Sequence, residues 1–174
     1  MARNIEIKAH VADLNALAAR AAAIADSGPT VISQDDTFFH CDNGRLKLRA
    51  FENATGELIF YRRADGSGPK QSFYVLSLTA SPDTLRTTLT QAYGQAGRVV
   101  KHRTLYLVGR TRVHLDRVAG LGDFMELEVV LADDETPEAG VREAQKLMEL
   151  LGVAADSLVE GAYVDLLRER AAAR

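Results

Sequence analysis

The feature that most constrains the fold is a strict alternation of charged and apolar residues in short segments spread along the chain. The first is NIEIK, residues 4–8, where Ile5 and Ile7 share one face of a strand and Asn4, Glu6 and Lys8 share the other. The same alternation recurs in RLKLRAF (45–51), KHRTLY (101–106), RTRVHLD (110–116) and MELEVV (125–130). We therefore predict strands with one apolar face and one face that is almost entirely charged.

Further strands are predicted at 34–40, 57–64 and 71–79, with a hairpin turn at Asp42-Asn43-Gly44 and another turn at 64–69. Helices are expected after Asp13, after Ser81-Pro82, from Thr136-Pro137 to Gly152, and from a capping box at 157–160. About eight antiparallel strands can avoid exposed edges by closing on themselves. The predicted fold is α+β and mainly β, a closed eight-stranded antiparallel β-barrel with helices packed outside, in a single domain over 1–174.

The charged faces allow two interpretations. They can face solvent, joined by cross-strand ion pairs. Alternatively, the apolar stripes of the predicted helices cover the apolar strand faces, and the charges then point into the barrel. A charged interior is costly unless a ligand compensates it, and the fitting ligands are a polyanion bound by the cations and a divalent metal bound by the carboxylates.

The same residues carry a resemblance to the CYTH superfamily, also called triphosphate tunnel metalloenzymes. This family includes class IV adenylyl cyclases, thiamine triphosphatases, inorganic triphosphatases and fungal RNA triphosphatases. Its opening signature, Glu-x-Glu-x-Lys, is matched here by Glu6 and Lys8, while Asn4 replaces the first Glu. RLKLR, KHR and HLDRVAGLGDFMELEV are similar to the family's later signatures. The resemblance implies a tunnel that binds a triphosphate with one or two Mg²⁺ or Mn²⁺ ions.

The resemblance also implies roles for individual residues. The triphosphate would be bound by Lys8, Lys47, Arg49, Arg63, Lys70, Lys101, Arg103 and Arg112. The metal ligands would be Glu6, Glu126, Glu128 and Asp116, and the catalytic groups Lys8, Arg49, Arg103 and Asp116. The sequence alone does not show whether Arg62 or Arg63 is the arginine that points inward. Arg45 and Arg110 are further cations that the alternation places on the inward face. His114 is either a proton donor to a leaving group or a hydrogen-bonded barrel residue.

The predicted function is a metal-dependent triphosphate phosphohydrolase. The alternatives are a class IV-type adenylyl cyclase, which converts ATP to 3′,5′-cyclic AMP and pyrophosphate, and a barrel that binds a nucleotide or polyphosphate without turnover. The substrate would be ATP, inorganic triphosphate or a thiamine triphosphate-like molecule. Because Asn4 retains only one oxygen ligand where the family has a carboxylate, a second metal would be held more weakly.

Composition excludes several other classes of protein. The net charge of −3 argues against general nucleic-acid binding. There is no apolar run of roughly 18 residues, so no membrane span is expected. Charged residues at 3, 6 and 8 argue against a signal peptide, and a single cysteine, Cys41, suits a reducing compartment, so we expect a cytoplasmic protein. A homodimer is a further, separate expectation.

Overall fold

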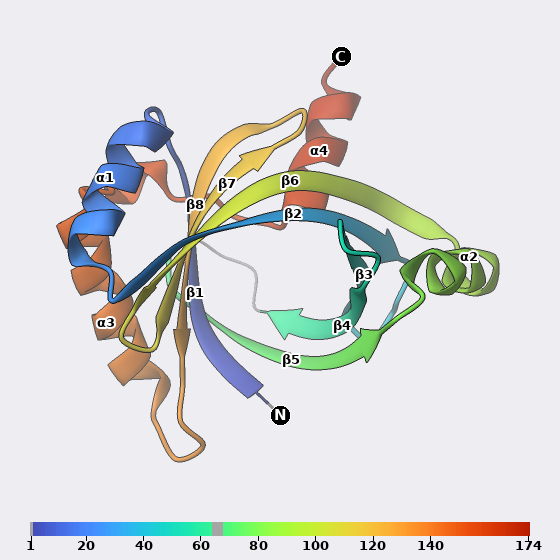
Figure 1. Cartoon of the computed structure of the whole chain (residues 1–174), viewed down its shortest axis with the longest axis horizontal. Helices are drawn as coiled ribbons and strands as arrows, with labels where there is room; N and C mark the ends of the chain where they lie inside the picture. The colour runs from blue at the N-terminus through green and yellow to red at the C-terminus, as the bar shows by residue number, and fades with distance from the viewer. Residues whose placement is uncertain (1, 64–67) are drawn as a thin grey trace.

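A computed structural model describes residues 2–63 and 68–174, and it confirms the predicted closed barrel. Its strands are β1 (Ala2–His10), β2 (Ser27–Phe39), β3 (Arg45–Phe51), β4 (Gly56–Arg63), β5 (Lys70–Thr79), β6 (Gln95–Val108), β7 (Thr111–Val118) and β8 (Gly122–Val130). They follow one another around the barrel in the order β1-β5-β4-β3-β2-β6-β7-β8, every pair antiparallel, and β8 closes onto β1 (Figure 1). All of the strands in the described part of the chain therefore belong to one sheet.

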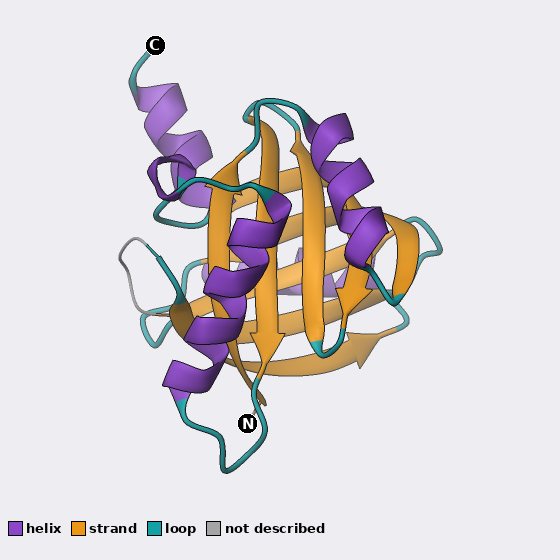
Figure 2. Cartoon of the chain, turned by 90° about the vertical axis from the view of Figure 1, so that its left-hand side faces the viewer, coloured by secondary structure: helices purple, strands orange, loops and turns teal. Residues whose placement is uncertain are grey.

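Four α-helices in the described part of the chain pack outside this barrel: α1 (Leu14–Ile24), α2 (Pro82–Tyr93), α3 (Pro137–Leu151) and α4 (Tyr163–Ala172). Helices α1 and α3 lie across the outer face of the barrel (Figure 2), where Leu17, Leu147 and Leu151 pack against Ile5 and Ile7 of β1. Because the apolar faces of the strands are covered from outside, the alternating charged residues point into the barrel. This arrangement decides between the two interpretations of the charged faces. None of the described helices is long and apolar enough to cross a membrane.

The predicted starts of the first three helices are confirmed. The side chain of Asp13 accepts a hydrogen bond of 2.9 Å from the backbone N–H of Ala16 at the start of α1. Pro82 and Pro137 occupy the first turns of α2 and α3, where the missing N–H has no helical partner to lose.

Two strands begin earlier than the sequence predicts. Strand β2 begins at Ser27. Pro29 has no N–H to donate to a neighbouring strand, but it lies where the pairing register with β6 shifts between Ser27 and Thr30, so the strand tolerates it. Strand β6 begins at Gln95 opposite Phe39, in a stretch that lacks the charged alternation. Pairing with a long neighbour, which local pattern cannot reveal, extends both strands.

The sequence correctly predicted a C-terminal helix, but the start predicted from the capping-box pattern at 157–160 is wrong, because α4 begins at Tyr163. Residues Ala155–Ser157 form one turn of 3₁₀ helix, and residues 158–162 connect it to α4 without helical structure. The backbone N–H of Val159 donates to the carbonyl of Lys8 on β1 at 2.9 Å, and Gly161 has a φ of 81°, which helices do not allow. Of the turn predicted at 64–69, residues 64–67 lie outside the described residues.

The two ends of the barrel differ. At one end, Tyr163 and Val164 of α4 pack against Phe38, Val99 and Phe124 from the strands, and we call this the α4 end. At the opposite end, β1, β2 and β7 begin and β5 finishes, and Leu76 and Leu78 of β5 are 43% and 78% exposed there. We call this the open end.

Candidate functional site

The interior of the barrel contains a cavity of ≈ 330 Å³ lined by inward-facing side chains of all eight strands. Its lining includes most of the cations and carboxylates predicted from the sequence: Glu6, Lys8, Lys47, Arg49, Arg63, Lys101, Arg103, Arg112, Glu126 and Glu128. Lys70 lines a smaller pocket that also contacts Glu6 and Arg63. Asp116 is fully buried in the wall beside Arg103.

One wall of the cavity is organised by Asp36, a residue that the sequence analysis did not select. Its carboxylate accepts two hydrogen bonds from Arg49, at 2.8 and 2.7 Å, and one from Lys47 at 3.1 Å, and Lys101 lies 3.9 Å away. Burial disfavours the carboxylate, but the three cations outweigh it and hold the pKa of Asp36 well below its usual value. Asp36 therefore keeps three cations gathered on one wall.

A second buried pair fixes Arg103. The guanidinium donates to both oxygens of Asp116 at 2.6 Å and to Glu126 at 2.5 Å. The hydroxyl of Tyr163 on α4 donates to Asp116 at 2.9 Å. Arg103 is thus held rigidly by a bidentate carboxylate, the geometry that gives arginine its directional specificity.

Helix α4 also contacts Lys8. The ammonium of Lys8 donates a hydrogen bond to the backbone carbonyl of Gly161 at 3.0 Å, lies 3.3 Å from Glu126, and lies 4.2 Å from the centre of the Tyr163 ring. Burial lowers the pKa of Lys8. Groups at the α4 end of the cavity therefore also position its cations.

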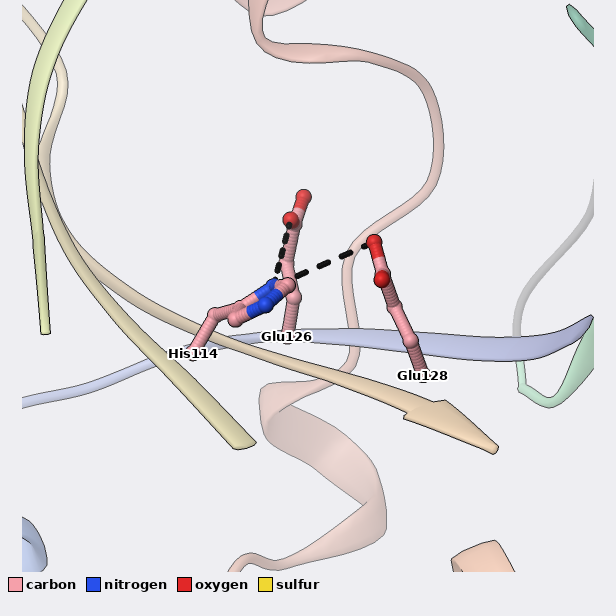
Figure 3. Close-up of side chains that lie close together, drawn as sticks. All are labelled: His114, Glu126 and Glu128. Carbon is pink, nitrogen blue, oxygen red and sulfur yellow. Dashed lines mark ion pairs between the residues drawn. The ribbon is translucent and has the colours of Figure 1, made fainter. Parts of the chain in front are cut away.

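An acidic cluster occupies the wall formed by β7 and β8. His114, Glu126 and Glu128 turn toward one another (Figure 3), and each offers a ligand atom within 4.8 Å of the others. Nδ1 of His114 lies 4.0 Å from Glu126 and 3.9 Å from Glu128. Glu6 faces Glu128 across the β1–β8 pair but is bound to Arg63 at 3.1 Å, and Asp116 is bound to Arg103, so neither belongs to this cluster.

Electrostatics keep the cluster in the ionisation state that a metal needs. Burial opposes ionisation of Glu126 and Glu128, but Lys8 and Arg103 hold the pKa of Glu126 well below its usual value, and His114, Arg112 and Arg103 lower that of Glu128 to about 2. Burial lowers the pKa of His114 to about 4, so its ring is neutral near pH 7. A neutral imidazole and two carboxylates are an ordinary donor set for a divalent ion.

Two further observations show that the residues fit a cation. His114 Nδ1 and Asn4 Oδ1 are buried and have no hydrogen-bond partner in the described part of the chain, which is costly unless a ligand or water completes them. Burial and the facing Glu128 raise the pKa of Glu6, as expected for carboxylates that lack a shared counter-ion. His114, which the sequence placed between two other roles, thus joins the carboxylates as a candidate ligand.

The remaining predicted cations lie in different places. Arg63 lines the cavity while Arg62 is exposed, which decides the register between them. Arg45 pairs with Asp165 of α4 at 2.6 Å, at the rim of the α4 end. The inward placement of Arg110 is wrong: it precedes β7 and pairs with Glu135 and Glu143 on the outer surface, because the turn rotates it out of the strand register.

A closed eight-stranded barrel with a charged central cavity, and with a helix packed against one end, defines the tunnel-barrel class of protein. The chain belongs to the CYTH domain family, whose family model matches residues 2–163. No curated protein sequence matches the chain.

Solved structures share the fold. The PH1012 protein from Pyrococcus horikoshii OT3 is 19% identical, with 94% of this chain and 99% of that chain covered and a TM-score of 0.84. A candidate adenylate cyclase from Vibrio parahaemolyticus is 19% identical, with coverage of 95% and 97% and a TM-score of 0.75. The Hippeastrum protein HpAC1, a candidate adenylyl cyclase described as having a dominant triphosphatase activity, is 15% identical, with coverage of 98% and 96% and a TM-score of 0.70. At these identities the likeness establishes the fold.

Proposed function

We propose that this chain is a divalent-metal-dependent phosphohydrolase that binds a small-molecule triphosphate in the barrel cavity and releases its terminal phosphate. One observation carries the proposal: a wall of fixed cations, Lys47, Arg49, Lys101 and Arg103, faces the same cavity as the carboxylate–imidazole cluster on β7 and β8. A metal-bridged triphosphate is the ligand that needs both kinds of wall at once.

The cations would act mainly by position. Arg103, fixed by Asp116, and Arg49, fixed by Asp36, cost little reorganisation when charge builds on the phosphate oxygens, which is how preorganised donors stabilise a transition state. A divalent ion held by Glu126, Glu128 and His114 would neutralise phosphate charge and lower the pKa of a water molecule. Glu6, whose pKa is raised by burial and by Glu128, is the carboxylate suited to accept a proton from an attacking water.

Two features of the neighbours agree with this proposal. The Hippeastrum structure is described as having dominant triphosphatase activity although the protein is also called a candidate adenylyl cyclase. A fission yeast RNA triphosphatase, Pct1, shares the fold with a TM-score of 0.55. Triphosphatase activity is thus named for other proteins with this fold, which supports hydrolysis as the proposal, while cyclisation additionally requires a ribose hydroxyl aimed at the α-phosphorus.

Phosphorus NMR of ATP and of tripolyphosphate, each incubated with the protein and Mg²⁺ and then Mn²⁺, tests the proposal. The expected products are orthophosphate with ADP from ATP, and orthophosphate with pyrophosphate from tripolyphosphate. Glu126→Gln and Glu128→Gln should each abolish their formation. Glu138→Gln, an exposed carboxylate on α3, is the matched control and should keep full activity.

Other products would contradict the proposal in distinct ways. Pyrophosphate together with 3′,5′-cyclic AMP would identify a cyclase. Absence of turnover of every triphosphate, with binding that survives EDTA, would identify a barrel that binds through its cations alone.

A further inference from the structure

A second pocket lies at the α4 end of the molecule, beside the barrel cavity. Its volume is ≈ 570 Å³, and it lies between α4, the ends of β2 and β4, and the start of β3. We call it the outer pocket. Among the described residues, four arginines and two aspartates line it: Arg45, Arg62, Arg63, Arg168, Asp42 and Asp165. The outer pocket therefore has a surplus of two positive charges.

Two aromatic rings separate the outer pocket from the cations inside the barrel. Phe38 and Tyr61 line both spaces, and the ammonium of Lys47 lies 5.7 and 5.6 Å from the centres of these two rings. Lys47 lines the barrel cavity and does not line the outer pocket, and the same holds for Lys101 and Arg103. An anion in the outer pocket would therefore leave the place of the triphosphate free.

One carboxylate serves two of the arginines. Arg45 donates to both oxygens of Asp165, at 3.2 and 2.6 Å. Arg168 lies 3.8 Å from the same aspartate and donates to the backbone carbonyl of Ala96 at 3.0 Å. Asp165 thus compensates Arg45 well and Arg168 only in part.

The other two arginines have unused donors. The guanidinium of Arg62 is exposed and has no hydrogen bond or ion pair within residues 2–63 and 68–174. Arg63 donates through Nη1 to Glu6 at 3.1 Å, while its Nη2 has no partner in the same ranges although the side chain is only 9% exposed. A buried donor without a partner carries a desolvation penalty, which an acceptor on a bound molecule would remove.

The donors of the outer pocket suit one kind of anion. All four of its cations are guanidiniums, whose planar forks match the oxygens of phosphate in pairs. A phosphate group carries close to two negative charges near pH 7, which equals the surplus of positive charge in the pocket. A phosphate would therefore balance the charge and satisfy the unused donors together.

We propose that the outer pocket binds a phosphate group, free or carried by a small organic molecule, through Arg62, Arg168 and the unused Nη2 of Arg63, and that it does so while the barrel cavity holds its own ligand. The site does not rest on the proposed function, because it lies outside the cavity and no bond is broken there. Since Arg63 also binds Glu6, a single side chain would link this phosphate to the barrel cavity.

Cys41 makes the outer pocket measurable, because it lines the pocket and is the only cysteine of the chain. Iodoacetate, which is an anion, and iodoacetamide, which is neutral, alkylate the same thiol. At low salt, the ratio of the iodoacetate rate constant to the iodoacetamide rate constant should be about threefold higher for Cys41 than for 2-mercaptoethanol, because the arginines attract the anionic reagent. Inorganic phosphate, added at constant ionic strength, should slow the reaction with iodoacetamide.

Variants locate the phosphate. Arg62→Gln and Arg168→Gln should each lower the rate ratio and raise the half-protecting concentration of phosphate about fivefold, as expected for one exposed charged contact. Arg142→Gln, the same change at an exposed arginine on α3, is the matched control and should change neither quantity. Lys101→Gln removes a cation from the barrel cavity and should leave the half-protecting concentration unchanged.

The source of the phosphate group is distinguished by testing phenyl phosphate beside orthophosphate. A lower half-protecting concentration for phenyl phosphate indicates an organic phosphate, and a lower one for orthophosphate indicates free phosphate. A rate ratio equal to that of 2-mercaptoethanol, or no protection by either compound, would overturn the site. Protection that Lys101→Gln weakens as much as Arg62→Gln does would place the anion in the barrel cavity and would overturn the site as well.

Discussion

Replacing Asp36 by Asn removes the carboxylate around which one wall of the cavity is built. The side chain is 1% exposed and is hydrogen-bonded to Arg49 and Lys47, with Lys101 3.9 Å away. The amide keeps one acceptor oxygen but no charge, so three buried cations lose their counter-ion. We expect the free energy of unfolding to fall by about 3 kcal/mol, near the lower end of what breaking a buried ion pair costs.

For a chain of this size, each kcal/mol of stability corresponds to roughly 2–4 °C in Tm, so the expected loss is about 10 °C. Thermal unfolding followed by circular dichroism near neutral pH measures it. Asp35→Asn is the matched control, because Asp35 makes the same kind of pair with Arg98 at 2.5 Å, but this arginine is 55% exposed. Exposed pairs contribute at most about 1 kcal/mol, so the control should lose only a few degrees.

The pH dependence has a definite sign. Because the pKa of Asp36 is lower in the folded chain than in the unfolded one, its contribution is complete above the unfolded value of about 4 and disappears as the pH falls through the folded value. The Tm of the unmodified protein and the Tm of Asp36→Asn should therefore converge as the pH becomes acidic. Saturating tripolyphosphate should restore much of the loss near neutral pH, since its charge replaces the missing carboxylate. The reasoning is refuted if Asp36→Asn costs no more than Asp35→Asn, or if tripolyphosphate stabilises neither protein.

Three further outcomes follow from the site and the fold. Burial lowers the pKa of Lys101 to about 7, so binding of tripolyphosphate near pH 8 should take up about one proton, measured by calorimetry in buffers of different ionisation heat, and Lys101→Arg should reduce the uptake. A Cβ at Gly97 would lie 2.4 Å from Val164 Cγ2, so Gly97→Ala should speed hydrogen exchange in α4, and adding Val164→Ala should restore slow exchange. Glu128→Gln should weaken Mn²⁺ binding at least tenfold, whereas Glu138→Gln should leave it unchanged; a titration that follows the electron paramagnetic resonance signal of free Mn²⁺ measures both.

The sequence predicted the barrel because alternation in five segments, together with apolar helices that need a surface to cover, left few other arrangements. It also selected most of the cations that line the cavity, since they belong to alternating segments such as RLKLR or KHR, whereas Arg63 was implied by the family resemblance. Where the alternation stops at a turn, as at Arg110, register alone gave the wrong side of the sheet.

Asp36 and Gln34 were missed for a related reason. In QDDTFF the inward residues Gln34, Asp36 and Phe38 mix amide, acid and aromatic, so period two has no chemical contrast there. Asp35 and Asp36 look alike in sequence, and only the pairing of β2 with β3 and β6 shows that Asp36 faces inward. His114 as a metal ligand depends on its distance from Glu126 and Glu128, which comes from the β7–β8 register rather than from sequence spacing.

The central claim is that one cavity holds a triphosphate and a divalent ion together. A crystal structure with Mn²⁺ and tripolyphosphate, using the anomalous scattering of the metal, tests it most directly. The account predicts an ion bound to Glu126, Glu128 and His114 and phosphates bound to Arg49, Lys101 and Arg103. Manganese away from this cluster, or tripolyphosphate bound only outside the barrel, would contradict it.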